Sequence, residues 1–136
     1  MTTRLDLSSL QSALASLDRG CARSRLTPDD EELRDAVIQR LAFTYELCWK
    51  MLKRRLEWDA PVPSDIDRLS FPDLLRVGAE HGLIADVEPW LVYRHQRNMT
   101  SHVYDADRAW DVYRSALAFA ADARRLLTEL EAGNDA

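Results

Sequence analysis

Apolar residues recur at helical spacing along most of the chain, and no segment alternates apolar and polar residues as a strand would. The first such segment runs from about residue 4 to 24. Its leucines at positions 7, 10, 14 and 17 are three or four residues apart, and Cys21 continues the stripe. This spacing predicts a helix that buries one face.

A second, longer segment extends to about Trp58 and carries an unusually broad apolar face. We expect Thr27 to cap its start, with Pro28 at the first helical position and acidic residues in the first turn. The face includes Val37, Leu41, Tyr45, Cys48, Leu52 and Leu56. One neighbour could not cover so wide a stripe, so this helix is predicted to lie at the centre of a bundle.

The remaining helices follow a break in the pattern. The prolines of residues 60–64 predict a connector through about residue 69. Ser70 is expected to cap a short helix over 71–81 that ends before Gly82. Asp86 is expected to cap a fourth helix. A fifth helix is predicted from about 106 to 131. Its expected core face is Trp110, Tyr113, Leu117, Ala120, Leu127 and Leu130.

These elements predict an all-α domain over residues 1–136, with 131–136 as a frayed tail. The architecture expected is an antiparallel up-and-down bundle of four main helices plus a short helix. Scarcity of turn residues, with 4 Gly and 5 Pro, favours long helices.

Charge and cysteine content narrow the class of protein. The net charge of −5 argues against a protein that coats nucleic acid nonspecifically, but it allows a local basic pocket. Cys21 and Cys48 lie on apolar stripes and are expected to be buried free thiols. The N-terminus lacks an apolar targeting segment, and no run has the length of a membrane span, so we expect a cytoplasmic location.

Arg97 and His102 could carry out chemistry together. On a continuous helix their side chains would diverge by about 140°, so they converge only if the helix ends between them. The intervening Met99, Thr100 and Ser101 favour such an end, because Thr and Ser compete for backbone hydrogen bonds. A helix ending near Met99 would leave His102 and Tyr104 on a short connector.

The pair suits RNA cleavage without a metal. A histidine can exchange a proton at cellular pH, and a guanidinium can stabilise a pentacoordinate phosphate. A symmetric dimer would double these groups. The alternative is a structural hydrogen-bonding role for Arg97 and His102. Arg76 and His81 have the same spacing at a helix end, where a structural role is expected, so the spacing alone is weak support.

Neighbouring residues remain open to two interpretations each. Asn98 suits phosphate binding or capping of the helix end, and Arg94, one turn away, could line the same cleft or face solvent. Glu46 and Lys50 form an i,i+4 pair that is expected to be a surface ion pair. The four tryptophans are expected to be core or interface anchors.

Several kinds of site are not predicted. The histidines at 81, 95 and 102 lack metal-ligand spacing with carboxylates, and no Glu-x-x-His occurs, so we expect no metal. No phosphate-binding or dinucleotide glycine loop is present, so no cofactor is predicted and the chain is not itself expected to be a nucleotidyltransferase.

A longer string around Arg97 resembles a known family. Arg97-Asn98-x-x-Ser101-His102-x-Tyr104 resembles the signature of HEPN proteins, specifically the HepT-like group also described as nucleotidyltransferase substrate-binding proteins. The segment from Ile38 to Lys50 is similar to the family's second helix, and Leu5-Asp6-Leu7-x-x-Leu10 also fits. The resemblance covers nearly the whole chain.

The resemblance implies a dimer in which the Arg-x4-His elements of both protomers face one cleft. It implies RNA cleavage by the toxin of a toxin-antitoxin pair, with Arg97 and His102 catalytic. Arg94 and Asn98 are candidate phosphate contacts because of their positions near Arg97. The antitoxin would be a minimal nucleotidyltransferase that transfers AMP onto Tyr104. The alternatives are a noncatalytic nucleotide- or substrate-binding subunit, with Tyr104 a half-buried phenol, and a helical scaffold.

Overall fold

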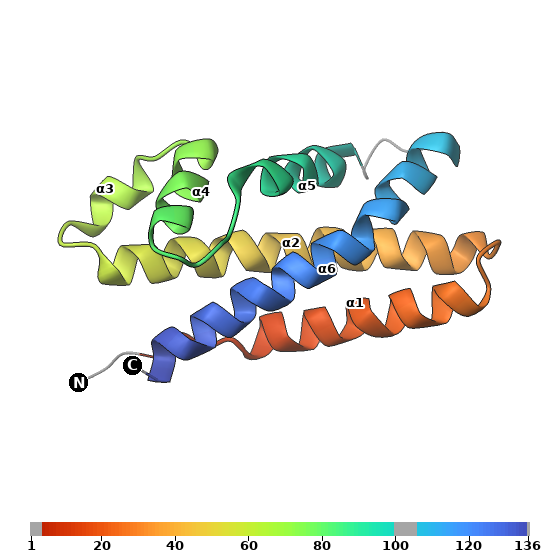
Figure 1. The fold of residues 1–136 in the computed structure, drawn as a ribbon, viewed down its shortest axis with the longest axis horizontal. Helices are drawn as coiled ribbons and strands as arrows, with labels where there is room; N and C mark the ends of the chain where they lie inside the picture. The colour runs from red at the N-terminus through yellow and green to blue at the C-terminus, as the bar shows by residue number, and fades with distance from the viewer. Residues whose placement is uncertain (1–3, 100–105, 136) are drawn as a thin grey trace.

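The computed structural model describes residues 4–99 and 106–135, and these ranges contain helices but no strand (Figure 1). The helices are α1 (Ser8–Leu26), α2 (Glu31–Asp59), α3 (Pro63–Asp67), α4 (Phe71–Glu80), α5 (Val87–Met99) and α6 (Ala106–Asp135). The prediction of an all-α fold with four long helices is confirmed. The chain has one short helix more than expected, because α3 interrupts the connector that we predicted over residues 60–69.

The central helix α2 contacts every other helix of the bundle in turn. It runs antiparallel to α1, and α6 packs against both of them, so these three helices form the main layer (Figure 1). α5 lies over α2 and α6, while α3 and α4 cover the far end of α2. The broad apolar face of α2 serves all these neighbours, as its sequence predicted.

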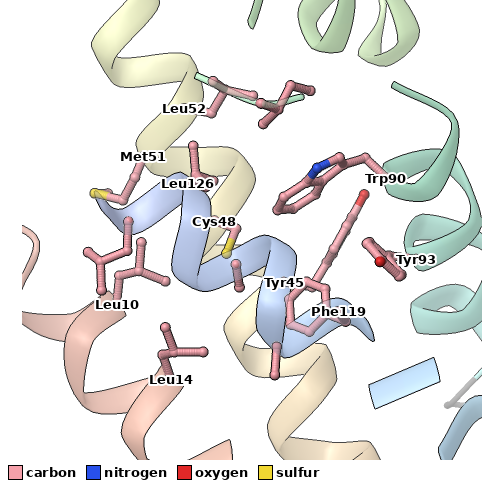
Figure 2. Packing of buried hydrophobic residues seen from close by; sticks show 14 of the residues in the cluster. Leu10, Leu14, Tyr45, Cys48, Met51, Leu52, Trp90, Tyr93, Phe119 and Leu126 are labelled. Carbon is pink, nitrogen blue, oxygen red and sulfur yellow. The ribbon is translucent and has the colours of Figure 1, made fainter. Parts of the chain in front are cut away.

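Aromatic rings fill the core where α2, α5 and α6 meet. Tyr45, Trp90, Tyr93 and Phe119 are all at most 4% exposed, and the Tyr93 and Phe119 ring centroids lie 5.1 Å apart in an edge-to-face arrangement. Figure 2 shows these rings clustered on one side of Cys48, with Leu10 and Leu14 of α1 on the other side. The two cysteines are buried free thiols, as expected.

The predicted start of α2 is wrong by several residues. Asp30, not Thr27, is the N-cap: its Oδ1 accepts hydrogen bonds from the backbone N–H groups of Glu32 and Leu33 at 2.9 and 3.1 Å. Thr27 instead ends α1, and Pro28 lies in the turn between the helices. Asp and Thr are both strong N-caps, so the competition between them is decided by how the turn fits the bundle.

The chain termini also differ from expectation. Residues 4–7 are not helical, although Leu5 and Leu7 are buried, so α1 begins later than predicted. The C-terminal residues 131–135 are not a frayed tail but the last turns of α6. Asn134 holds them in place: its side chain accepts a hydrogen bond from the Leu5 N–H and donates one to the Leu5 carbonyl, each 2.9 Å long.

The expected core face of α6 is right only in part. Ala120, Leu127 and Leu130 are buried, but Trp110 and Tyr113 are half-buried and Leu117 is 46% exposed. Phe119, absent from the prediction, is fully buried. The helix crosses α1 and α2 obliquely (Figure 1). Phe119 therefore lies on its buried face, where it packs against aromatic rings of α2 and α5. None of the helices in the described ranges is both long enough and apolar enough to span a bilayer.

Ser70 and Gly82 bound α4 as predicted. The Ser70 hydroxyl accepts a hydrogen bond from the Asp73 N–H, and Gly82 adopts a φ of 76°, which places it in the left-handed region that favours glycine. Asp86 accepts a hydrogen bond from the Glu88 N–H at the start of α5. These caps direct α5 back along α2, and this path brings Arg94 and Arg97 to the candidate site.

Candidate functional site at Arg97

A cavity of about 340 Å³ lies between α2, α5 and the segment that contains α3 and α4. Its polar lining among the described residues is Glu46, Lys53, Arg94, Arg97 and Asn98. Its aromatic and apolar lining is Tyr45, Trp49, Ile66, Leu69, Phe71 and Leu74. The described lining thus holds three cations and one carboxylate, and Lys53 is in turn paired with Asp67, with 2.7 Å between Nζ and Oδ1.

Arg97, in the last turn of α5, is bound to α2 by an ion pair. Its Nη2 lies 2.8 Å from Oε1 of Glu46, and its Nη1 donates a 3.2 Å hydrogen bond to Oδ1 of Asn98. A cation is favourable at this end of a helix, where the carbonyl groups carry partial negative charge. The side chains of Arg97 and Glu46 are 40% and 28% exposed, so the guanidinium is oriented yet accessible.

Glu46 contacts Arg97 and Trp49 in addition to Lys50, the one partner that the sequence predicted. Its Oε2 also accepts a hydrogen bond from the indole N–H of Trp49 at 3.1 Å. The predicted pair with Lys50 is present at 4.0 Å and is longer than the pair with Arg97. Sequence reasoning missed Glu46 as a site residue, because Arg97 lies far from it along the chain. The one available signal was its place in the segment that resembles the family's second helix.

Arg94 lines the same cavity one turn before Arg97. Its guanidinium carbon lies 4.5 Å from the centre of the Phe71 ring, which is a cation–π contact. Arg94, Arg97 and Asn98 therefore line one cavity, which favours the first of the two interpretations left open for Arg94, and their contact with RNA stays a prediction.

Tyr45 contributes a hydroxyl with an unusual environment. The residue is 2% exposed, lines the cavity, and its hydroxyl has no hydrogen-bond partner within the described part of the chain. Burial raises the pKa of the Tyr45 phenol, and Arg94 opposes that shift only in part. The group therefore stays protonated at cellular pH and can donate a hydrogen bond.

His102 and Tyr104 lie outside the described residues, as do Thr100 and Ser101. α5 and α6 are separate helices that end and begin on either side of this segment, at Met99 and Ala106. The convergence of Arg97 with His102, and the position of Tyr104, stay predictions.

The second Arg-x4-His pair lies in structural surroundings. Arg76 forms an ion pair with Asp73 one turn earlier, with 2.5 Å between Nη1 and Oδ1. His81 is the exposed C-cap of α4. Neither residue lines the Arg97 cavity. Searched over the described ranges, the chain holds no cluster of three or more His, Cys, Asp or Glu that could bind a metal ion.

Comparison with known proteins assigns the chain to a family. Residues 5–132 match the family described as nucleotidyltransferase substrate binding protein like. A protein of Haemophilus influenzae named "Probable ribonuclease HepT" is 37% identical over 98% of this chain and 97% of its own length. The chain belongs to this HepT-like group of nucleotidyltransferase substrate-binding proteins, as its sequence resemblance predicted.

Solved structures support the same fold. One is a structure from Haemophilus influenzae that is described as revealing the fold of a substrate-binding domain of a nucleotidyltransferase. It has a TM-score of 0.87 and 34% identity, and the match covers 93% of this chain and 99% of that one. A crystal structure from Thermus thermophilus has a TM-score of 0.74 and 26% identity, covering 89% of this chain and 98% of its own. The similarity therefore extends over the whole bundle and includes the helices that carry Glu46 and Arg97.

Proposed function

We propose that the protein is a metal-independent endoribonuclease that acts in the cytoplasm as the toxin of a toxin-antitoxin pair. Its site comprises Arg97 and His102 as catalytic residues, with Arg94 and Asn98 as phosphate contacts. The observation that carries the proposal is the fixed guanidinium of Arg97 at the wall of a basic cavity, in a chain of the HepT-like group. The name of the Haemophilus relative supports the same reaction class.

The reaction needs only proton transfer and charge stabilisation. The ribose 2′-oxygen attacks the adjacent phosphorus, a new P–O bond forms, and the bond to the 5′-oxygen of the next nucleotide breaks. His102 takes the proton from the 2′-hydroxyl, and an acid returns one to the leaving oxygen. Arg97 stabilises the charge on the phosphoryl oxygens, because a guanidinium matches their geometry. The products are a 2′,3′-cyclic phosphate and a 5′-hydroxyl.

A homodimer would supply the second set of groups. One histidine cannot be both the base and the acid in the same step, but two copies of His102 in a shared cleft can divide these tasks. The paired arginines would likewise double the positive charge around the phosphate.

Purified protein, free of any partner, provides the test. In buffer with EDTA it should degrade single-stranded RNA to fragments with cyclic phosphate ends, and His102→Ala should leave the RNA intact. Equal degradation by the two proteins would point to a contaminating nuclease, and loss of wild-type activity in EDTA would contradict metal independence.

We further propose that the antitoxin is a minimal nucleotidyltransferase that inactivates the enzyme through Tyr104. The phenol oxygen attacks the α-phosphorus of ATP, an ester to AMP forms, and pyrophosphate leaves. The added phosphate competes with RNA for Arg97, and the adenosine blocks the cleft. Incubation with ATP and the cognate nucleotidyltransferase should add AMP masses to the intact protein. Mass gains that persist in Tyr104→Phe would place the acceptor elsewhere.

A second candidate is a noncatalytic subunit that presents nucleotide or substrate to a nucleotidyltransferase. The description of the matched family and the acidic net charge favour it. This candidate predicts intact RNA, a stable complex with the nucleotidyltransferase, and nucleotide binding measurable by titration calorimetry. Absence of nucleotide binding, both with and without the partner, would rule it out.

A further inference from the structure

The buried hydroxyl of Tyr45 does nothing for the core that surrounds it. The ring packs against Phe119 and Trp90 (Figure 2) and against Phe71, with centroid distances of 6.2 to 6.3 Å. A phenylalanine would make the same contacts. A buried hydroxyl that lacks a partner is destabilising, because it has lost its hydrogen bonds to water. Such a group in a cavity wall indicates a ligand that completes its hydrogen bonding.

The rest of the cavity presents aromatic rings and a guanidinium group to a ligand. Trp49 and Phe71 line it together, with ring centroids 6.2 Å apart and planes nearly perpendicular at 83°. Arg94 lies over the Phe71 ring. Proteins that recognise unpaired RNA stack bases on aromatic rings and on guanidinium planes, and they read the base edge by hydrogen bonds.

The cavity also adjoins the place where the phosphate would be bound. Arg97 and Asn98 line the same wall as Arg94. A nucleotide whose phosphate contacts Arg97 would therefore bring its base toward the aromatic residues. The volume of about 340 Å³ lies at the lower end of the range for small-ligand pockets, which suits one base rather than a longer segment.

We propose that this cavity is a base-recognition subsite, in which one unpaired nucleobase beside the cleaved phosphate contacts Trp49 and Phe71 and accepts a hydrogen bond from the Tyr45 hydroxyl. The proposal rests on the ribonuclease function proposed above and adds to it a preference for particular bases. The hydroxyl can donate a hydrogen bond to an acceptor atom on the base edge, and this contact would favour bases that present an acceptor at that position.

Tyr45→Phe tests the subsite, because it removes the hydroxyl and keeps the ring. Cleavage sites are mapped on an RNA that contains all four bases in every flanking context. The wild type should show a base preference next to the cut, and the variant should lose about fivefold in kcat/KM for the preferred base, the effect of one neutral hydrogen bond. Its Tm should be unchanged or higher, because the core loses a buried polar group. Unchanged preference and rate would overturn the proposal.

Tyr93→Phe is the matched control. Tyr93 is equally buried and lies in the same aromatic cluster, but its hydroxyl donates a 2.5 Å hydrogen bond to Asp122 and the residue does not line the cavity. This variant should lose stability and keep the base preference. If both variants shift the preference alike, the effect comes from altered packing of the aromatic cluster and the subsite is rejected.

Failure of the ribonuclease function can be told apart from failure of the subsite. If the wild type cleaves no RNA, the function proposed above is wrong, and the four ribonucleoside 5′-monophosphates become the probe. Binding is followed by NMR shifts of the indole N–H of Trp49, assigned with Trp49→Phe. If the affinity read from these shifts is about fivefold weaker in Tyr45→Phe, the subsite is supported. No chemical-shift change with any mononucleotide would overturn it.

Discussion

A single carboxylate, Glu46, connects the arginine of the candidate site to the aromatic wall of the cavity. One of its oxygens is paired with Arg97 and the other accepts the Trp49 indole N–H. An arginine side chain has many rotamers, and fixing it before substrate arrives lowers the entropy lost in the transition state. We infer that Glu46 is a positioning residue that acts through Arg97.

Glu46→Gln should separate positioning from binding. The amide keeps the size of the side chain but loses the charge that orients Arg97, so kcat should fall about tenfold, by analogy with the loss of one charge-assisted hydrogen bond. KM should stay the same or fall, because a competing anion has left the phosphate site. Steady-state cleavage of a short fluorescent RNA measures both constants.

Glu80→Gln is the control, since Glu80 lies at the end of α4 and does not line the cavity. A fall in kcat with a rise in KM, together with a lower Tm, would mean that Glu46 supports the fold only. Identical constants for the wild type and Glu46→Gln would remove Glu46 from the site.

At the scale of the helices, the N-cap of α2 is a local stability element. Asp30→Ala leaves two backbone N–H groups of the first turn without their partner. It should lower the free energy of unfolding by about 1 kcal/mol, as measured in urea. Asp29→Ala changes the neighbouring acid that is not the cap and should cost much less. Equal losses would assign the effect to general charge near the helix start.

The spacing of apolar residues was sufficient to predict the long helices, because each buries a continuous stripe. The start of α2 was harder, since Thr27 and Asp30 both suit an N-cap and only the turn geometry chooses between them. The tail was predicted to fray because the last residues of a domain are usually poorly ordered unless other contacts hold them. Its order comes from distant partners: Asn134 binds Leu5, and the buried Arg55 donates to Asn134 and to the Leu130 carbonyl.

At the candidate site, too, contacts between residues distant in the sequence could not be predicted. Arg94, Arg97 and Asn98 could be grouped from sequence because they are neighbours on one helix. Glu46, Trp49 and Phe71 come from other helices, and no local pattern indicates that they share the cavity. Tyr45 was predicted to be buried, and it is, but the environment of its hydroxyl emerges only from the packing.

At the scale of the whole molecule, the proposed chemistry needs two copies of the chain in one cleft. When the wild type is mixed with an excess of His102→Ala under conditions that allow subunit exchange, hybrid dimers carry only one His102. Because the proposed mechanism divides the base and the acid between two copies of His102, these hybrids should be inactive, and the mixture should cleave less RNA than the same amount of wild type alone. Cleavage of RNA by the mixture, compared with wild type diluted in buffer, measures this loss. Unchanged activity with verified exchange would argue against a shared cleft.

The chain itself offers the most direct test of the central claim, because it contains the same Arg-x4-His spacing twice. Arg97 is paired with Glu46 at the basic cavity, whereas Arg76 is paired with Asp73 on the surface of α4. Cleavage of RNA should be compared for Arg97→Ala and Arg76→Ala under identical conditions. We predict a loss of about a hundredfold or more for Arg97→Ala, as for removal of a charge-stabilising donor, and near wild-type activity for Arg76→Ala. Equal activity of the two variants would contradict the assignment of the ribonuclease site to the Arg97 cavity.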